Sequence, residues 1–451
     1  MWEPGVRRLT AGTILAIALV GFEALAVATI MPDVRDDLGG IGLYGWVFSA
    51  FFLGNIVGIV SAGHSADRHG PGRAFMTGLV LFGLALLAAG LAPSMAVLVA
   101  ARFVQGVGGG AIPAAANVAI VRGYAPAAQP RMFALFSTAW VLPAVVSPAL
   151  SAAISDAWDW RWVFLGLLPL VVINAFVTAP ALHGLGPPGG EAAPDRRPRA
   201  LALTAGTAIA LAALSAPSVV LAVPLFAVGA AIAARAFTRL MPAGTTRLAP
   251  GPPAAVAIRG AAVVAFFGVD AFVSLALTSL HGASTLLAGG ALTASSLAWT
   301  AGAWIQERRI GTDGPRRLVR VGLLTIAAGI AGMVGVVRTD VSPWYAVAAW
   351  SVAGFGMGIA YAPVSLTVFA ATARGTEGAS AAALSLTDAL GIAIGTGASG
   401  VLVAFGDDRG WYAATALTIA FTACGVVAVL GGLAASRLPQ LLGADAPGAG
   451  A

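Results

Sequence analysis

The chain has 451 residues, of which 59% are hydrophobic and only 10% are charged. Soluble domains carry about 25% charged residues, so this composition excludes a soluble globular protein and predicts an all-α polytopic membrane protein. All 25 basic residues are arginine, and they sort by membrane side instead of forming a patch for nucleic acid. The single cysteine, Cys424, lies in an apolar run, which excludes a disulfide framework and a thiolate metal site.

Apolar runs recur along the whole chain at lengths close to that of a bilayer span. The first six cover residues 10–31, 43–62, 74–92, 94–121, 132–154 and 162–182. The last six cover residues 256–280, 284–305, 318–337, 343–371, 379–404 and 411–435. Two shorter runs, 200–214 and 217–236, lie between these sets and predict an inserted helical hairpin. We expect 14 spans; 12 spans with a partly buried hairpin is the alternative, because the run 200–214 is short.

This order of runs predicts five segments. They are an N-terminal six-helix bundle (1–182), a Pro- and Gly-rich cytoplasmic linker (183–199), the inserted hairpin with its following loop (200–253), a C-terminal six-helix bundle (254–437) and a disordered C-terminal tail (438–451).

The arginines also predict the orientation. With the N-terminus inside, 19 arginines fall on inner segments and 4 on outer ones, and Arg102 and Arg259 are the remaining two. This asymmetry places both termini in the cytoplasm. A chain rich in Ala and Gly with arginine as its only basic residue type is typical of a high-GC bacterium, which implies the plasma (inner) membrane.

One carboxylate lies inside the first apolar run. Glu23 is nine residues before Pro32, or about 13 Å along a helix. An ionised side chain at that depth costs at least about 2.5–3.5 kcal/mol, so it needs a partner, a wet cavity or a proton. Arg102, in the fourth run, lies at an equal depth and predicts a Glu23–Arg102 pair. The alternatives are a structural polar contact for Glu23 and an Arg102 side chain that reaches the outer interface.

An internal repeat relates the two halves. Three glycines of the first half, Gly106, Gly108 and Gly110, recur at an offset of 248 as Gly354, Gly356 and Gly358. Each set is followed by a proline, Pro113 in the first half and Pro363 in the second. An offset of 247 takes Glu23 to Asp270. Both halves begin with the same orientation, which predicts parallel repeats with a substrate site near the bilayer midplane.

The glycines lack the strand and helix context of a phosphate-binding loop, so we expect close helix packing with a bend at Pro113. Pro143 and Pro148 likewise predict a bendable fifth helix.

Other intramembrane polar residues allow two interpretations each. Asp388 is either a coupling residue or a polar contact capped by its neighbours, and Asn117 either lines the cavity or bonds between helices. The histidines lie in loops or at span ends, and no catalytic or metal-ligand spacing occurs. We therefore expect no enzyme, no cofactor and no metal.

The sequence predicts a short inner loop, residues 63–73, between the second and third runs, and this segment resembles the signature of the major facilitator superfamily. The matching residues are Gly63, Asp67, Arg68, Gly70 and Arg73, whereas Gly72 stands where a basic residue is usual. The resemblance implies two six-helix halves, and it implies that Asp67 and Arg68 latch these halves on the cytoplasmic side in the outward-open state.

Further residues resemble the drug:proton antiporter branch. Arg102, Gln105 and Gly106 match the fourth-helix motif associated with proton coupling, and the spacing of Glu23 to Pro32 resembles the first-helix motif of the fourteen-span branch. The fifth-helix motif departs, because Ser147-Pro148 replaces Gly-Pro. The inserted hairpin fits the fourteen-span branch.

The residues and the resemblance together predict a proton-coupled antiporter that exports amphiphilic or cationic small molecules by alternating access. Its expected partners are a small-molecule substrate, protons and the lipid bilayer, without nucleic acid, and we expect a monomer. The alternative is a dedicated transporter of an endogenous lipid or metabolite. A membrane-embedded enzyme or receptor is the third interpretation, and the lack of a catalytic constellation argues against it.

Overall fold

The computed structural model separates the chain into two compact units, Met1–Thr204 and Ala205–Ala451. The residues that it describes are 4–124, 132, 135, 139, 141–183, 185, 195–214, 218–337, 341–371, 377–409 and 411–440. Most of the predicted linker and most of the predicted C-terminal tail lie outside these ranges, as does the turn at 215–217. The described residues form helices joined by short connections, without strands.

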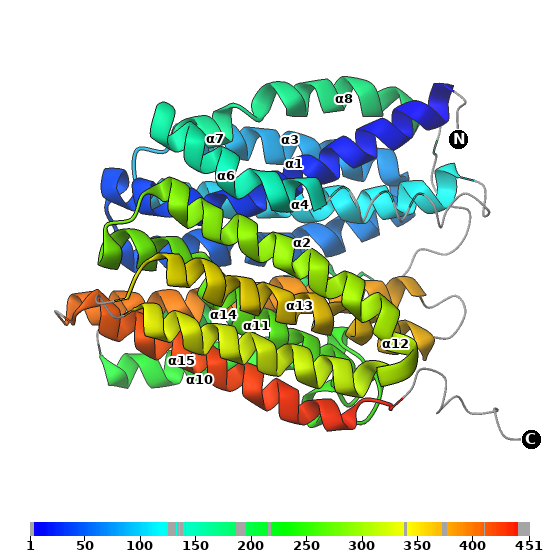
Figure 1. The fold of residues 1–451 in the computed structure, drawn as a ribbon. Coiled ribbons are helices and arrows are strands. Elements are labelled where there is room, and N and C mark those ends of the chain that lie inside the picture. The colour runs from blue at the N-terminus through cyan, green and yellow to red at the C-terminus, as the bar shows by residue number, and fades with distance from the viewer. Residues whose placement is uncertain are drawn as a thin grey trace, which may run out of the picture. The chain divides into compact units, whose positions relative to one another are not determined.

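The helices of the first unit follow the predicted apolar runs (Figure 1). They are α1 (Pro4–Leu38), α2 (Tyr44–His69), α3 (Pro71–Gly90), α4 (Met95–Gly123), α6 (Val141–Ala157), α7 (Arg161–Leu165), α8 (Leu168–His183) and α9 (Arg197–Ala213), whose last turns belong to the second unit. Within this unit α4 packs against α2 and α3, while α1 packs against α6 and α8.

The second unit repeats this arrangement. Its helices are α10 (Val219–Leu240), α11 (Pro252–His281), α12 (Thr285–Val336), α13 (Trp344–Ala370), α14 (Glu377–Asp408) and α15 (Ala413–Ala434). The two predicted runs 284–305 and 318–337 form the arms of α12, which reverses at Gly314 (φ 67°, ψ 168°) ahead of Pro315. Helix α13 packs against α12, and α11 packs against α14 and α15, as α4 and α1 pack in the first unit.

Eleven helices within the described residues are long and apolar enough to cross a membrane, counting α12 once. Helix α9 has 17 residues, about 25 Å at 1.5 Å per residue, whereas the hydrocarbon core is about 30 Å thick. The choice between 12 and 14 spans therefore stays a prediction.

The glycine repeat creates the same close helix contacts in both units. A methyl group on Gly106 of α4 would lie 1.9 Å from the carbonyl oxygen of Phe51 in α2, and one on Gly354 of α13 would lie 2.2 Å from that of Ser295 in α12. Three further close contacts of the first unit have a counterpart in the second. Those of the first unit are Gly110 with Asn55, Gly58 with Val107 and Gly108 with Gly78. Their counterparts are, in the same order, Gly358 with Trp299, Gly302 with Phe355 and Gly356 with Gly322. Small residues let helix backbones approach this closely inside a membrane, so the repeat is one of packing as well as sequence.

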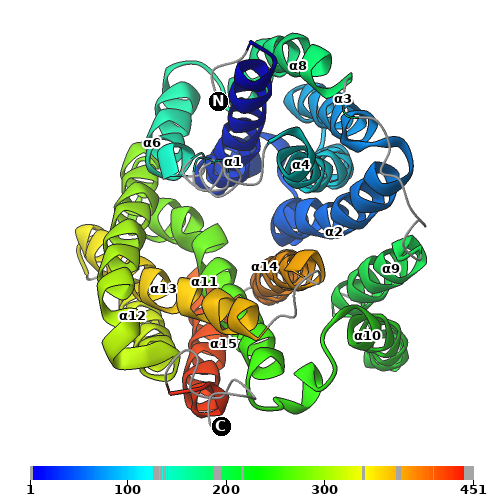
Figure 2. The same cartoon turned by 90° about the vertical axis from the view of Figure 1, so that its right-hand side faces the viewer.

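Helices α9 and α10 form the predicted hairpin and lie side by side (Figure 2). Gly206 and Gly229 face each other, since a methyl group on either would lie 2.8 Å from the carbonyl oxygen of the other. Each also meets the backbone of the small residue four positions beyond its partner, Ala233 or Ala210, at 2.5 Å. Two small-xxx-small motifs therefore hold the hairpin together.

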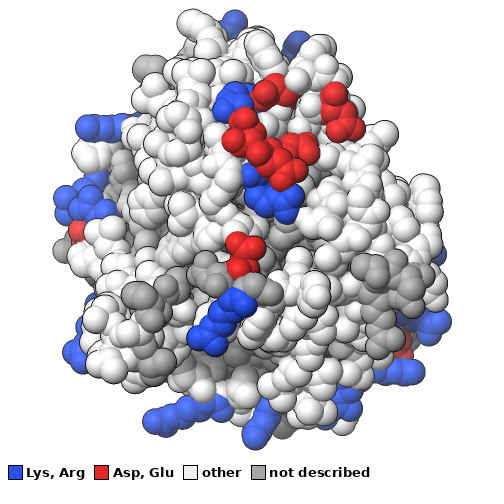
Figure 3. Space-filling model, turned by 90° about the vertical axis from the view of Figure 1, so that its left-hand side faces the viewer, with Lys and Arg blue, Asp and Glu red and all other residues white. Residues whose placement is uncertain are grey.

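Acidic side chains gather on the face shown in Figure 3. At the end of α1, Asp33 accepts a hydrogen bond from Ser155 of α6, and Asp37 accepts one from the Trp160 indole at 3.2 Å. Arg161 lies 2.7 Å from the Asp37 carboxylate. These contacts tie α1 to α6 and α7 at the end that the arginine distribution places outside the cell.

The close glycine contacts predict which glycines tolerate a side chain. Gly106→Ala introduces a methyl group that overlaps the Phe51 carbonyl oxygen, and overpacking of this kind costs about 1–3 kcal/mol. We expect a lower melting temperature in detergent for Gly106→Ala and for its repeat partner Gly354→Ala. Gly290→Ala is the matched control, because a methyl group there meets no atom within 4 Å. Equal melting temperatures for all three variants would contradict this account of the repeat.

Candidate functional site: buried acids on repeated helices

The predicted Glu23–Arg102 pair is present in the first unit. Glu23 on α1 and Arg102 on α4 are fully buried, and the Arg102 guanidinium donates to Glu23 Oε1 through Nη1. The same nitrogen donates to Gln105 Oε1 at 2.7 Å, and Arg102 Nε donates to the Val47 carbonyl oxygen at 3.2 Å. The guanidinium also lies over the Phe51 ring, 4.3 Å from its centroid. The fourth-helix residues therefore hold one another and the acid of α1 in a single cluster.

The charges of this pair compensate each other. The Glu23 side chain has no exposed surface and that of Arg102 has 1%, so neither charge is solvated from outside. Burying an isolated charge is costly, and an opposite charge with further hydrogen bonds offsets that cost. The geometry thus excludes one of the alternatives that the sequence allowed, namely that the Arg102 side chain extends to the outer interface.

The second unit holds an acid at the related position, with a different partner. Asp270 on α11 accepts a hydrogen bond from the Trp350 indole of α13, with 2.8 Å between Nε1 and Oδ1. Trp350 is fully buried and stacks on Phe266, with 4.8 Å between ring centroids. Asp270 itself is only partly buried. Its carboxylate therefore has a neutral donor where Glu23 has a cation.

The third intramembrane acid forms an ion pair that the sequence did not reveal. Arg259 of α11 binds both oxygens of Asp388 on α14, at 2.7 Å each, and donates to Ser365 at 2.6 Å. The Tyr361 hydroxyl donates to the same carboxylate at 2.8 Å, and the Arg259 guanidinium covers the Tyr361 ring at 3.7 Å. The Asp388 side chain is 21% exposed. Asp388 is thus a paired residue at a partly accessible position.

The remaining candidate residues lie elsewhere. Asn117 is exposed on α4, 15 residues or about 22 Å along the helix from Arg102, so it does not join the Glu23 cluster. Pro113 and Pro363 lie inside α4 and α13, which continue past them. Pro143 and Pro148 lie inside α6 and are buried. Within the described part of the chain, no group of three or more His, Cys, Asp or Glu could hold a metal ion.

The signature segment is more helical than expected. We expected a loop from Gly63 to Arg73, but α2 continues to His69 and α3 begins at Pro71, so only Gly70 (φ 85°) connects them. Gly63 lies inside α2, and the helix ends only where Gly70 adopts a positive φ ahead of Pro71. The side chain of Asp67 lies outside the described residues, while Arg68 and Arg73 are exposed.

A linker residue reaches this signature segment. Asp195 lies 3.8 Å from His64 Nδ1, and its carboxylate accepts hydrogen bonds from the Arg197 side chain at 2.8–3.1 Å. These bonds and the backbone N–H of Arg197 hold the pKa of Asp195 well below its ordinary value. Asp195 therefore stays ionised at neutral pH beside His64.

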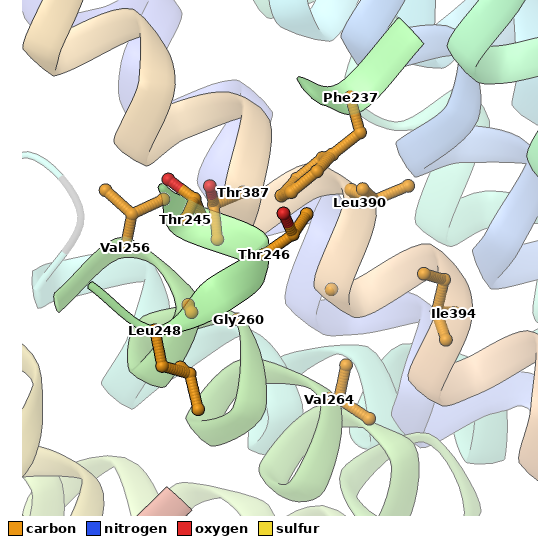
Figure 4. A pocket seen from close by; sticks show the side chains of 12 residues that line it. Phe237, Thr245, Thr246, Leu248, Val256, Gly260, Val264, Thr387, Leu390 and Ile394 are labelled. Carbon is orange, nitrogen blue, oxygen red and sulfur yellow. The ribbon is translucent and has the colours of Figure 1, made fainter. Parts of the chain in front are cut away.

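An apolar cavity of about 300 Å³ lies near the start of α11 (Figure 4). Phe237, Leu248, Val264 and Ile394 line it, and its polar lining consists of threonines. It contains no charged residue, so it offers neither a proton nor a counter-charge to a substrate. The acids described above are the candidates for that role.

Two helical units of the same internal packing, with acids at repeat-related positions in membrane-length helices, define a secondary transporter built from parallel repeats. Residues 13–396 match the Major Facilitator Superfamily, and the chain belongs to that family. The resemblance in the signature segment is thereby confirmed.

Two relatives are named for multidrug efflux or multidrug resistance. A probable multidrug-efflux transporter of Mycobacterium tuberculosis (strain ATCC 25618 / H37Rv) is 27% identical over 94% of this chain and 94% of its own length. Multidrug resistance protein 3 of Bacillus subtilis (strain 168) is 30% identical over 37% of this chain and 32% of its own length.

Solved structures share the fold at low sequence identity. An auto-inhibited POT family peptide transporter has a TM-score of 0.72 at 15% identity, covering 97% of this chain and 99% of its own. A D-xylose–proton symporter has a TM-score of 0.69 at 14% identity, covering 96% and 98%. These similarities confirm the all-α major facilitator fold.

The buried pair predicts a large stability effect. Arg102→Ala leaves the Glu23 charge without its partner, and removal of one partner from a buried pair costs about 3–5 kcal/mol. We expect a marked fall in melting temperature for Arg102→Ala, with part of it recovered in Glu23→Gln/Arg102→Ala. The control is Arg317→Ala, which breaks an ion pair whose arginine is 72% exposed and should cost at most about 1 kcal/mol. A wild-type melting temperature for Arg102→Ala would refute the role of the pair.

Proposed function

We propose that this chain is a proton-coupled antiporter of the plasma membrane, with both termini in the cytoplasm, that exports amphiphilic or cationic small molecules. The observation that carries the proposal is the set of acids at depth in membrane-length helices, with Glu23 and Asp270 on repeat-related helices. Acids in such positions are characteristic of proton relays and substrate sites. The relative named as a probable multidrug-efflux transporter supports export as the direction of transport.

The proposed cycle is alternating access. A proton bound to one of the intramembrane acids enters as a substrate molecule leaves, while the two halves rock around the site. One charge crossing 100 mV is worth about 2.3 kcal/mol, enough for roughly fiftyfold accumulation of substrate per net proton before any pH gradient is added. Asp67 and Arg68 are proposed to latch the halves in the outward-open state, as the family signature implies.

Transport in proteoliposomes tests this proposal. With the purified full chain and an imposed pH gradient, we expect gradient-driven movement of the hydrophobic cation tetraphenylphosphonium against its own gradient. Glu23→Gln/Asp270→Asn should abolish the gradient-driven component, because both repeat-related acids lose their exchangeable charge. Trp304→Phe, at an exposed position of α12, is the matched control and should transport as the wild type does.

Two results would contradict the proposal. One is gradient-driven transport that survives in the double variant, and the other is a wild type that moves no cation under any pH gradient. In the second case, tight binding of a lipid or metabolite by the same protein would favour a dedicated transporter of an endogenous compound.

A further inference from the structure

The internal repeat relates the hydrogen-bond donors of the two acids as well as the acids themselves. The offset of 248 that superimposes the glycines of α4 on those of α13 also takes Arg102 to Trp350. In the structure these two residues make the equivalent contact, because Arg102 donates a hydrogen bond to the acid of α1 and Trp350 donates one to the acid of α11. These are the first helices of the two predicted six-helix bundles. At this position the second half has a neutral indole N–H where the first half has a guanidinium.

The exchange of partner changes the charge of the site. Glu23 with Arg102 is a neutral pair, whereas an ionised Asp270 bonded to Trp350 has a net charge of −1. Asp388 is also neutralised, since Arg259 binds both of its oxygens. Of these three intramembrane acids, Asp270 alone has no cationic partner among the described residues.

Among the described residues, no other charged group pairs with Asp270. On α11 itself, Arg259 and His281 are each 11 residues away, about 16 Å along the helix. The helices packed against α11 contribute the following titratable or charged groups: Glu307, Arg308, Arg309, Asp313, Arg316, Arg317 and Arg320 on α12, Tyr345 and Tyr361 on α13, Glu377, Asp388, Asp407 and Asp408 on α14, Cys424 on α15, Arg247 on the short helix η3 (Thr245–Arg247) and Arg437 on the short helix η4 (Ala435–Arg437). Cys424 faces Gly268 of α11, and Tyr361 bonds to Asp388. No ion pair joins any of these groups to Asp270 in the described part of the chain.

A row of aromatic side chains begins beside Asp270. Phe267 lies three residues before it, hence on the same side of α11, and its ring centroid is 6.4 Å from that of Trp299. Trp299 in turn meets the Tyr361 ring at 5.5 Å. All three rings are partly accessible, whereas Phe266 lies buried behind them. The far end of the row is occupied, because the Arg259 guanidinium already covers Tyr361.

This arrangement is suited to an organic cation. Aromatic faces attract cations, and the attraction strengthens where water is excluded. A carboxylate without a counter-charge adds a charge–charge attraction for the cation, which the uncharged rings lack. A cation seated between Phe267, Trp299 and Asp270 would therefore supply the charge that Arg102 supplies to Glu23 in the other half.

We infer that Asp270, with Phe267 and Trp299, is the site where an organic cation and a proton exclude each other, and that Trp350 is the positioning residue that keeps this acid exchangeable. In the exchange the cation binds the Asp270 carboxylate and the carboxyl proton passes to water, so that charge is conserved. The inference rests on the proposed function and narrows it, because it assigns the exchanged proton to one of three acids.

Proton release from the purified, detergent-solubilised full chain tests this assignment, with tetraphenylphosphonium as the added cation in weakly buffered solution. The wild type should release protons on binding, and its dissociation constant should fall about tenfold per pH unit while Asp270 is mostly protonated. Asp270→Asn should bind more weakly, release no proton and lose the pH dependence. Phe267→Ala and Trp299→Ala should weaken binding and keep the proton release. Trp304→Phe is the control for the loss of an indole and should match the wild type.

The Trp350 variants separate positioning from mere support of the fold. Trp350→Arg gives Asp270 the partner that Glu23 has, so proton release should disappear even where melting temperature and elution volume show a folded protein. Trp350→Phe keeps the ring and removes only the N–H donor, so release should persist with a displaced pH midpoint. If Trp350→Arg does not fold, the displaced midpoint of Trp350→Phe carries the test, and an unchanged midpoint overturns the role of Trp350.

Other outcomes decide the assignment of the proton. Release that persists in Asp270→Asn and vanishes in Glu23→Gln or Asp388→Asn overturns the inference and leaves the proposed antiport intact. A wild type that shows neither release nor gradient-driven transport overturns both. Loss of release in Asp270→Asn, with transport measured in the same preparation, supports the inference.

Discussion

A carboxylate buried in a helix of membrane-spanning length dictates much of the first unit. Glu23 has no exposed surface, so its charge must be met by groups from neighbouring helices. Arg102 meets it, and Arg102 is in turn held by Gln105, by the Val47 carbonyl oxygen and by the Phe51 ring. One ionisable side chain thereby fixes how α1, α2 and α4 face each other.

The glycines make this arrangement possible. Arg102 of α4 can reach the Val47 carbonyl oxygen and the Phe51 ring because Gly106 brings α4 against the backbone of α2. The α12 and α13 pair is built in the same way, with Gly354 against Ser295, and there the close approach packs α13 beside the arm of α12 that carries Trp299. The small residues and the polar contacts thus act together, because close helix packing brings the hydrogen-bond donor within reach of the buried acid.

The sequence predicted the architecture well because each of its signals was strong. The apolar runs predicted the helices, and the spacing of the glycines predicted a repeat that the structure shows as matched backbone contacts. The Glu23–Arg102 pair was predictable from equal depth alone, since two opposite charges inside a membrane have few alternatives to each other. The signature segment was less well predicted, because polar residues at the end of α2 suggested a loop where the helix in fact continues to His69.

The partners of the other two acids were missed for different physical reasons. Arg259 lies 11 residues before Asp270 and 129 before Asp388, so sequence distance did not indicate that its guanidinium group binds Asp388. Trp350 was missed because a tryptophan in an apolar run is counted as an apolar residue, although its indole N–H can donate a hydrogen bond. The offset of 248 that relates the glycines could have found it, had it been applied to Arg102 as well.

The difference between the repeats matters more for function than their likeness. Two identical halves would hold either two neutral pairs or two acids without a cationic partner. Replacing the guanidinium of Arg102 with the indole of Trp350 keeps the hydrogen bond and its direction while removing a single positive charge. Glycines at repeat-related positions keep the same backbone contacts around the two sites, so the change in charge leaves these contacts in place. One such difference between related helical halves therefore exchanges an ion pair for an acid with a neutral donor, and our inference about Asp270 rests on that difference.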